Sequence, residues 1–116
     1  MSQISLAEAA DLLQKLFSEK VRLATFFITS SGARLRLDGF LTGADREKGI
    51  FITTRPLPDG GGDWLNVSPF KKGECVFSYG EARELPEDLR KGILGESALL
   101  IDFLSTGERF AMFFTL

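Results

Sequence analysis

The sequence changes character once, after Lys20, and this change limits the folds open to the chain. Beyond Lys20, β-branched and aromatic residues alternate with polar ones in short runs that glycine-containing turns separate, a pattern typical of short antiparallel strands. Before it lies one helical pattern. A chain of 116 residues, 44% of them hydrophobic, is long enough for one core, so we expect residues 1–116 to form a single domain.

The helical segment is predicted over about residues 5–19. Ser5 and Glu8 have the spacing of a capping box, in which each side chain binds a free backbone N–H group at the start of a helix. Apolar residues then recur at helical spacing and define one amphipathic face that must pack on something: Leu6, Ala9, Ala10, Leu13, Leu16 and Phe17.

The strands of the first part are expected within residues 21–85. The run Val21–Thr29 is apolar on both faces, which predicts a strand covered on both sides, with the N-terminal helix as one cover. A second strand follows from Arg34 to Leu41, and Gly39 within it predicts a strong bend or bulge. Residues 49–54 form a third strand, and the proline- and glycine-rich residues 55–63 are expected to form a mobile surface loop.

The last part of the chain is predicted as a short helix followed by a hairpin. Pro86 early and Gly95 late mark a helix over about 86–94. Two apolar runs within 97–116 then pair through a turn at Gly107. The final run, Phe110–Leu116, is apolar to its end, so we expect it to be a sheet edge that self-association covers.

These elements favour a mainly β fold: a small, partly open β-barrel of about six or seven antiparallel strands with an N-terminal α-helix. An α+β sandwich is the alternative.

Composition excludes several kinds of chemistry. The 14 Lys+Arg and 16 Asp+Glu give a net charge of −2, which favours no strong electrostatic partner and does not support RNA binding. There is no histidine, and on this ground histidine-dependent triads and zinc centres are both taken as excluded. Cys75 is the single cysteine and is interpreted as a small buried hydrophobe in a reducing compartment. We expect no catalytic residue, metal or cofactor, no membrane segment, and a cytoplasmic location.

One segment carries a family resemblance. Gly39, Leu41 and Asp45, followed by the apolar run Ile50–Ile52, are similar to the first signature of Sm-like proteins, which also follows an N-terminal helix. The resemblance covers roughly residues 5–85 and implies a small Sm-like or SH3-like barrel that forms rings by strand pairing.

The resemblance also implies an RNA-binding site. By position, the RNA base would be bound by Asp45, Lys48 and Tyr79, and the phosphates by Arg34 and Arg36. The sequence departs from the family at two places in that pocket. Gly49 stands where an Asn is usual, and Tyr79-Gly80 stands where Arg-Gly is usual.

A second resemblance is to the N-terminal barrel of YcgR-type, PilZ-associated flagellar regulators. The strand Ile50–Arg55, the Pro56 and polar loop that follow it, and the turn Lys71–Gly73 that leads into the strand Glu74–Phe77 resemble that barrel. The arginine pair that binds cyclic dinucleotides in those proteins has no counterpart, because no two arginines here lie four residues apart.

The sequence is therefore compatible with two functions. The first is a non-enzymatic oligomerising binding or regulatory module, Sm-like, that pairs with copies of itself through strand edges and has RNA as the partner implied by resemblance. The alternative is a small-ligand-binding protein or enzyme with a site in the barrel mouth, lined by Trp64, Tyr79 and nearby carboxylates.

Overall fold

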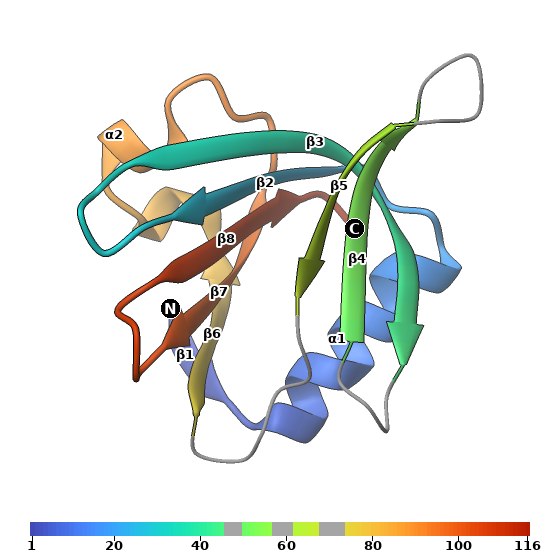
Figure 1. The fold of residues 1–116 in the computed structure, drawn as a ribbon, viewed down its shortest axis with the longest axis horizontal. Coiled ribbons are helices and arrows are strands. Elements are labelled where there is room, and N and C mark those ends of the chain that lie inside the picture. Colours follow the sequence, from blue (N-terminus) through green and yellow to red (C-terminus); the bar gives the residue numbers. More distant parts are fainter. Residues whose placement is uncertain (46–49, 57–61, 68–73) are drawn as a thin grey trace.

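A computed structural model describes residues 1–45, 50–56, 62–67 and 74–116, with the backbone alone described from residue 44 to residue 67. It contains one antiparallel sheet of eight strands, in the order β1-β6-β7-β8-β2-β3-β4-β5 (Figure 1). The elements in chain order are β1 (Ser2–Ile4), α1 (Leu6–Ser18), β2 (Leu23–Ile28), β3 (Arg34–Asp45), β4 (Ile50–Pro56), β5 (Gly62–Val67), β6 (Cys75–Glu81), the 3-10 turn η1 (Ala82–Glu84), α2 (Glu87–Arg90), β7 (Ser97–Phe103) and β8 (Arg109–Phe114).

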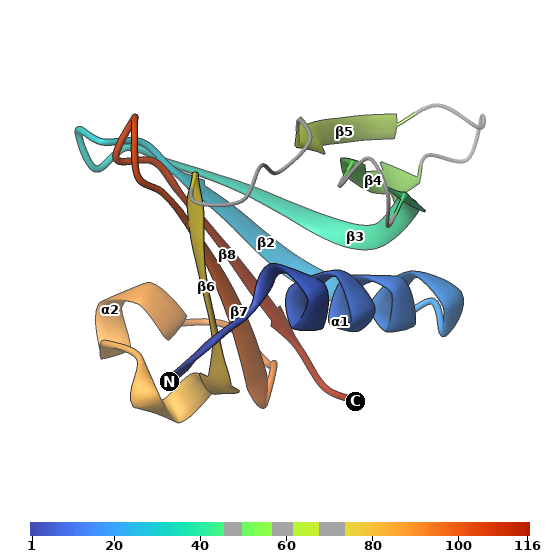
Figure 2. The ribbon, with the colours of Figure 1, turned by 90° about the horizontal axis from the view of Figure 1, so that it is seen from below.

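The sheet curls but does not close, so the mainly β, partly open architecture with an N-terminal helix is confirmed. Most of the curl lies in β3, which pairs with β2 along its first half and with β4 along its second. Figure 2 shows this strand bending between the two parts of the sheet. The register shifts between Leu41 and Gly43, just beyond the bend predicted at Gly39, because β3 has one residue more than β4 at this point. Such a bulge increases the local twist of the strand.

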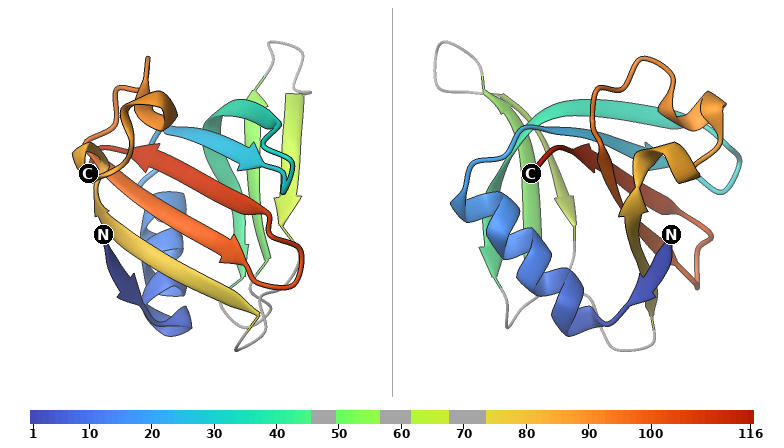
Figure 3. Two further views of the ribbon diagram at one scale, coloured as in Figure 1. Left: turned by 90° about the vertical axis from the view of Figure 1, so that its left-hand side faces the viewer. Right: turned by 180° about the vertical axis from the view of Figure 1, so that it is seen from behind.

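Helix α1 forms as the sequence predicts. The hydroxyl oxygen of Ser5 accepts a hydrogen bond from the Glu8 backbone N–H at 3.1 Å, and the Glu8 carboxylate accepts one from the Ser5 N–H at 3.1 Å. The helix lies across the inner, concave face of the sheet (Figure 3). Its buried residues join the main core, which consists of Ala9, Leu13, Leu16, Leu23, Leu41, Phe77, Leu99, Ile101, Phe110, Met112 and Phe114.

The outer face of β7 and β8 is also covered. The segment that follows β6, with η1 and α2, packs there and forms a second cluster with the sheet: Ala82, Leu85, Leu89, Ala98, Leu100, Ala111 and Phe113. Burial on both faces explains why the last two strands are nearly continuous apolar runs. The strand predicted at 21–29 has its inner face under α1 and its outer face beside this second cluster.

Several features differ from the predictions made from the sequence: the sheet has eight strands rather than six or seven, and β3 continues past Leu41 to Asp45. The last strand, β8, is not an edge: it pairs with β7 on one side and with β2 on the other. Strand β1 was not expected, because it has only 3 residues and no alternating pattern can be recognised over that length. Helix α2 ends at Arg90 rather than near 94. The loop expected at 55–63 is shorter, since residues 55–56 pair with 62–63, and residues 57–61 lie outside the described part.

Candidate binding surfaces

Tyr79 lies on the inner face of β6. Its side chain is half-buried and packs against the main core, and its ring stacks on that of Phe114 with 6.2 Å between centroids and 8° between planes. In β6 it pairs with Leu99 of β7 and with Ser2 of β1. The position of Tyr79 is therefore explained by core packing.

Arg34 and Arg36 lie on the outer face of β3, as their alternation with Leu35 and Leu37 predicts. Arg34 donates to the backbone carbonyl of Asp88 at 3.1 Å and to the Asp88 carboxylate at 3.3 Å. These bonds connect β3 to α2 across the outer face of the sheet.

Arg36 forms a two-pronged pair with Asp38 on the same face. Its Nε lies 2.9 Å from Asp38 Oδ1, and a terminal nitrogen lies 3.0 Å from Oδ2. This hydrogen bonding raises the pKa of Arg36. The guanidinium also lies over the Phe26 ring, 5.6 Å from its centroid, so Arg36 is held by two contacts at once.

The five residues proposed for RNA binding do not all meet. Arg34 and Arg36 share one face of β3, whereas Tyr79 faces the interior from β6, which β7, β8 and β2 separate from β3. Asp45 ends β3 and pairs with Ile50 of β4. The Asp45 side chain and the whole of Lys48 lie outside the described residues, so RNA binding by this set stays a prediction.

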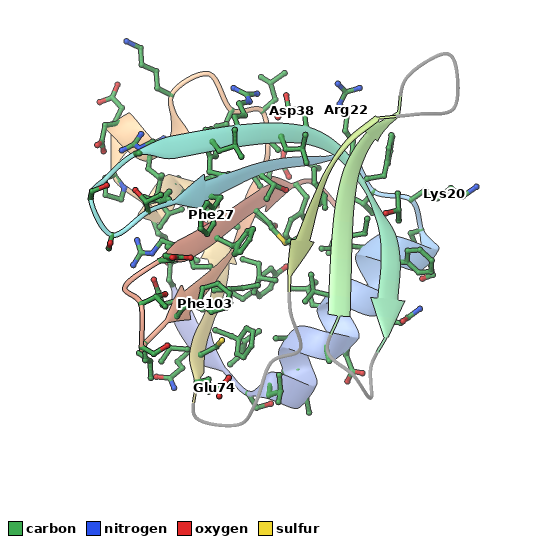
Figure 4. The ribbon with its side chains drawn as sticks, in the orientation of Figure 1. Lys20, Arg22, Phe27, Asp38, Glu74 and Phe103 are labelled. Carbon is green, nitrogen blue, oxygen red and sulfur yellow. The ribbon has the colours of Figure 1, made fainter. Side chains whose placement is uncertain are left out.

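A groove on the outer face, which we call the outer groove, has a volume of about 390 Å³. It lies between the start of β2, the middle of β3, the end of β8 and the chain that follows α2. Its lining residues are Arg22, Leu23, Ala24, Arg36, Asp38, Gly92, Leu94, Gly95, Phe113, Phe114 and Thr115. In Figure 4, Arg22, just before β2, and Asp38 of β3 project on the side away from α1.

Arg22 is the second positively charged residue of this groove, and unlike Arg36 it has no partner among the described residues. It is exposed, and in the part of the chain that the structure describes its side chain makes no hydrogen bond or ion pair. Arg22 could not be recognised from the sequence, because it precedes a strand and belongs to no motif. Only the approach of β8 and of residues 92–95 turns its position into part of a groove.

The wall opposite Arg22 is held close to the sheet at Gly95. A Cβ atom at this position would lie 2.5 Å from the backbone nitrogen of Phe114 and 2.9 Å from the carbonyl carbon of Phe113. Only glycine permits this approach of two backbones. The neighbouring Leu94 is 97% exposed, so an apolar side chain stands at the entrance of the groove.

The sheet itself ends in two edges, β1 and β5. Strand β1 has 3 residues, whereas β5 has 6 and pairs with β4 alone among the described residues. The backbone of β5 is therefore the longer of the two edges.

The described ranges hold neither a cluster of metal-ligating side chains nor a helix that could cross a membrane. They contain no group of three or more Cys, Asp or Glu side chains that could hold a metal ion. No helix within them is long and apolar enough to cross a membrane.

Cys75 is half-buried rather than fully buried, and burial raises the pKa of its thiol. The Trp64 side chain lies outside the described residues, so the site proposed in the barrel mouth stays a prediction.

Comparison with known proteins identifies no relative. No family model matches the sequence, and searches of curated proteins and of solved structures gave no significant match. The fold and the surfaces described above are therefore the basis for any statement about function.

Proposed function

We propose that this chain is a non-enzymatic binding or regulatory module, similar to Sm-like proteins, that assembles with copies of itself through an edge of its sheet. The observation that carries the proposal is the position of β5 at the end of an open eight-stranded sheet. The edge expected at the C-terminal strand does not exist, so the proposal now concerns β5.

An edge strand presents a row of backbone N–H and C=O groups that can pair with another strand. With 6 residues, β5 offers enough backbone for a short ladder, which β1 with 3 residues does not. Pairing of β5 with the β5 of a second copy would be antiparallel and two-fold symmetric, and would give a dimer. Pairing of β5 with β1 of a second copy would instead give a ring or an open chain.

Absolute mass in solution tests the proposal directly. Light scattering on a size-exclusion column is expected to show a dimer or a larger closed assembly, and a strict monomer at high protein concentration would overturn the proposal. Repeating the measurement with a short oligo-U RNA tests the implied partner. A mass shift with RNA that Arg34→Gln and Arg36→Gln abolish would support the predicted phosphate contacts.

Two proline variants in β5 provide a matched control. Successive N–H groups of a strand point to opposite sides within the sheet plane, so of Leu65 and Asn66 one N–H faces β4 and the other faces the free edge. Proline at the edge-facing position should dissociate the assembly and leave the fold intact, because it removes a donor that only a second copy uses. Proline at the other position should disrupt the pairing with β4. Full assembly by the folded variant with proline at the edge-facing position would exclude β5 as the interface.

A further inference from the structure

The outer groove combines one unpaired cation with an apolar lining. Its charged lining residues are Arg22, Arg36 and Asp38, and the last two neutralise each other through their two hydrogen bonds. The charge left in the groove is therefore 2 − 1 = +1, carried by Arg22. A ligand with a single negative charge would balance it.

Most of the other lining residues are apolar. Ala24 of β2 is half-buried, and Leu94 stands at the entrance with 97% of its surface exposed, whereas Leu23, Phe113 and Phe114 are almost fully buried and contribute little surface to the groove. A volume of about 390 Å³ lies within the usual range for sites that bind small organic molecules. The exposed Leu94 would lose contact with water when a ligand with an apolar body occupies the groove.

We propose that the outer groove binds a small organic monocarboxylate with an apolar body. The planar guanidinium of Arg22 presents parallel N–H donors that match the two oxygens of a carboxylate. The apolar body of the ligand lies along Ala24 and Leu94. This site is separate from the β5 edge, so it does not depend on the assembly proposed above.

Asp38 gives the groove its preference for one negative charge over two. The carboxylate of Asp38 occupies both prongs of Arg36, so Arg36 is not available to a second anionic oxygen. The charge of Asp38 also repels an additional negative charge on a ligand. A phosphate monoester with two negative charges is therefore bound less well than a carboxylate of the same length.

A titration followed by amide NMR tests the proposal on the complete chain. Octanoate, below the concentration at which it forms micelles, should shift the amides of Arg22, Leu94 and Gly95, whereas 1-octanol and octylamine should shift them at least tenfold less at equal concentration. Equal shifts with all three compounds would overturn the role of the carboxylate. No shift with octanoate would overturn the site.

Substitution of the arginine separates the site from general charge effects. Arg22→Gln should weaken octanoate binding at least tenfold, whereas Arg83→Gln, which removes one exposed positive charge outside the groove, should leave it within twofold. Leu94→Ser should weaken octanoate binding but leave acetate binding unchanged. Because Arg22 and Leu94 are exposed, these variants should fold, and their amide spectra check this directly. Unchanged octanoate binding by folded Arg22→Gln would overturn the proposal.

The charge preference has a test of its own. Asp38→Asn releases Arg36 and raises the charge of the groove to +2, so binding of octyl phosphate should improve at least tenfold relative to octanoate. An unchanged ratio of the two affinities would show that Asp38 does not set the preference and would overturn this part of the proposal.

Discussion

At the scale of single residues, the hydroxyl of Thr25 is the clearest departure from an ordinary core. Thr25 is 1% exposed, and its hydroxyl has no hydrogen-bond partner among the described residues. A buried polar group without a partner costs stability. We predict that Thr25→Val raises the free energy of unfolding by about 1 kcal/mol, since valine has nearly the same shape and no hydroxyl.

Urea unfolding of the two proteins measures this difference. Thr25→Ser is the control, because it keeps the hydroxyl and removes a methyl group, and it should lower the free energy of unfolding. A valine variant less stable than the original protein would show that the hydroxyl is satisfied in solution.

Gly95 is important for stability because the neighbouring backbone leaves no room for a side chain. We predict that Gly95→Ala lowers the free energy of unfolding by about 2 to 3 kcal/mol, because its Cβ would meet the backbone of Phe114 and Phe113, which cannot rotate away. Gly92→Asn is the control: Gly92 has a φ of 77° but nothing within 4 Å of an added Cβ, and asparagine tolerates this conformation. Equal losses for the two variants, measured by thermal unfolding, would contradict this account.

At the scale of elements, the capping box makes the stability of α1 depend on pH. Hydrogen bonds from the Ser5 backbone, and then from its side chain, hold the pKa of Glu8 below its usual value. A lowered pKa in the folded state stabilises the fold above the ordinary pKa of a glutamate, near 4.5, and this contribution is lost as the pH falls through the lowered value.

We therefore predict that Glu8→Gln lowers stability at pH 7, and that the difference from the original protein shrinks below about pH 4. Urea unfolding at several pH values measures it. Glu19→Gln, just after the same helix, is the control for the loss of one negative charge. A constant difference between the original protein and Glu8→Gln from pH 7 to pH 3 would exclude this role of the carboxylate.

The apolar face of α1 fills the inside of the curled sheet. Leu13 and Leu16 are fully buried in the main core. We predict that Leu13→Ala lowers the free energy of unfolding by about 2 to 5 kcal/mol, because it leaves a cavity between helix and sheet. Lys15→Ala on the exposed face should change it by less than about 0.5 kcal/mol. If the two variants lost equal stability, α1 would not be packed as described.

Local patterns predicted these elements well. The start of α1 depends on Ser5 and Glu8, which are close in sequence, and the pairing of β7 with β8 depends on two adjacent apolar runs joined at Gly107, whose φ is 72°. By contrast, the neighbour of β8 on its other side is β2, from the opposite end of the chain, and no local pattern specifies that pairing. Arg22 was missed for the same reason, because the groove around it forms only when β2, β8 and residues 92–95 meet.

At the scale of the whole molecule, the sheet has a well-covered centre and weakly held margins. Strands β7 and β8 are paired on both edges and covered on both faces, whereas β1 has 3 residues and one neighbour in the sheet. We predict that hydrogen exchange is slowest for the amides of β7 and β8 and fastest within the sheet for β1. Amide exchange followed by NMR measures this order, and faster exchange in β8 than in β1 would contradict the topology.

The central position of β8 also affects how the chain can acquire its fold. Strand β8 is the last strand in chain order, yet it joins β7 to β2 in the middle of the sheet. During synthesis, one edge of β2 and one edge of β7 therefore stay unpaired until β8 has left the ribosome. The pairing of β2 with β8 joins residues far apart in sequence, and such contacts form slowly. The nascent chain carries its greatest risk of aggregation in this interval, and chaperone binding would be of most use there.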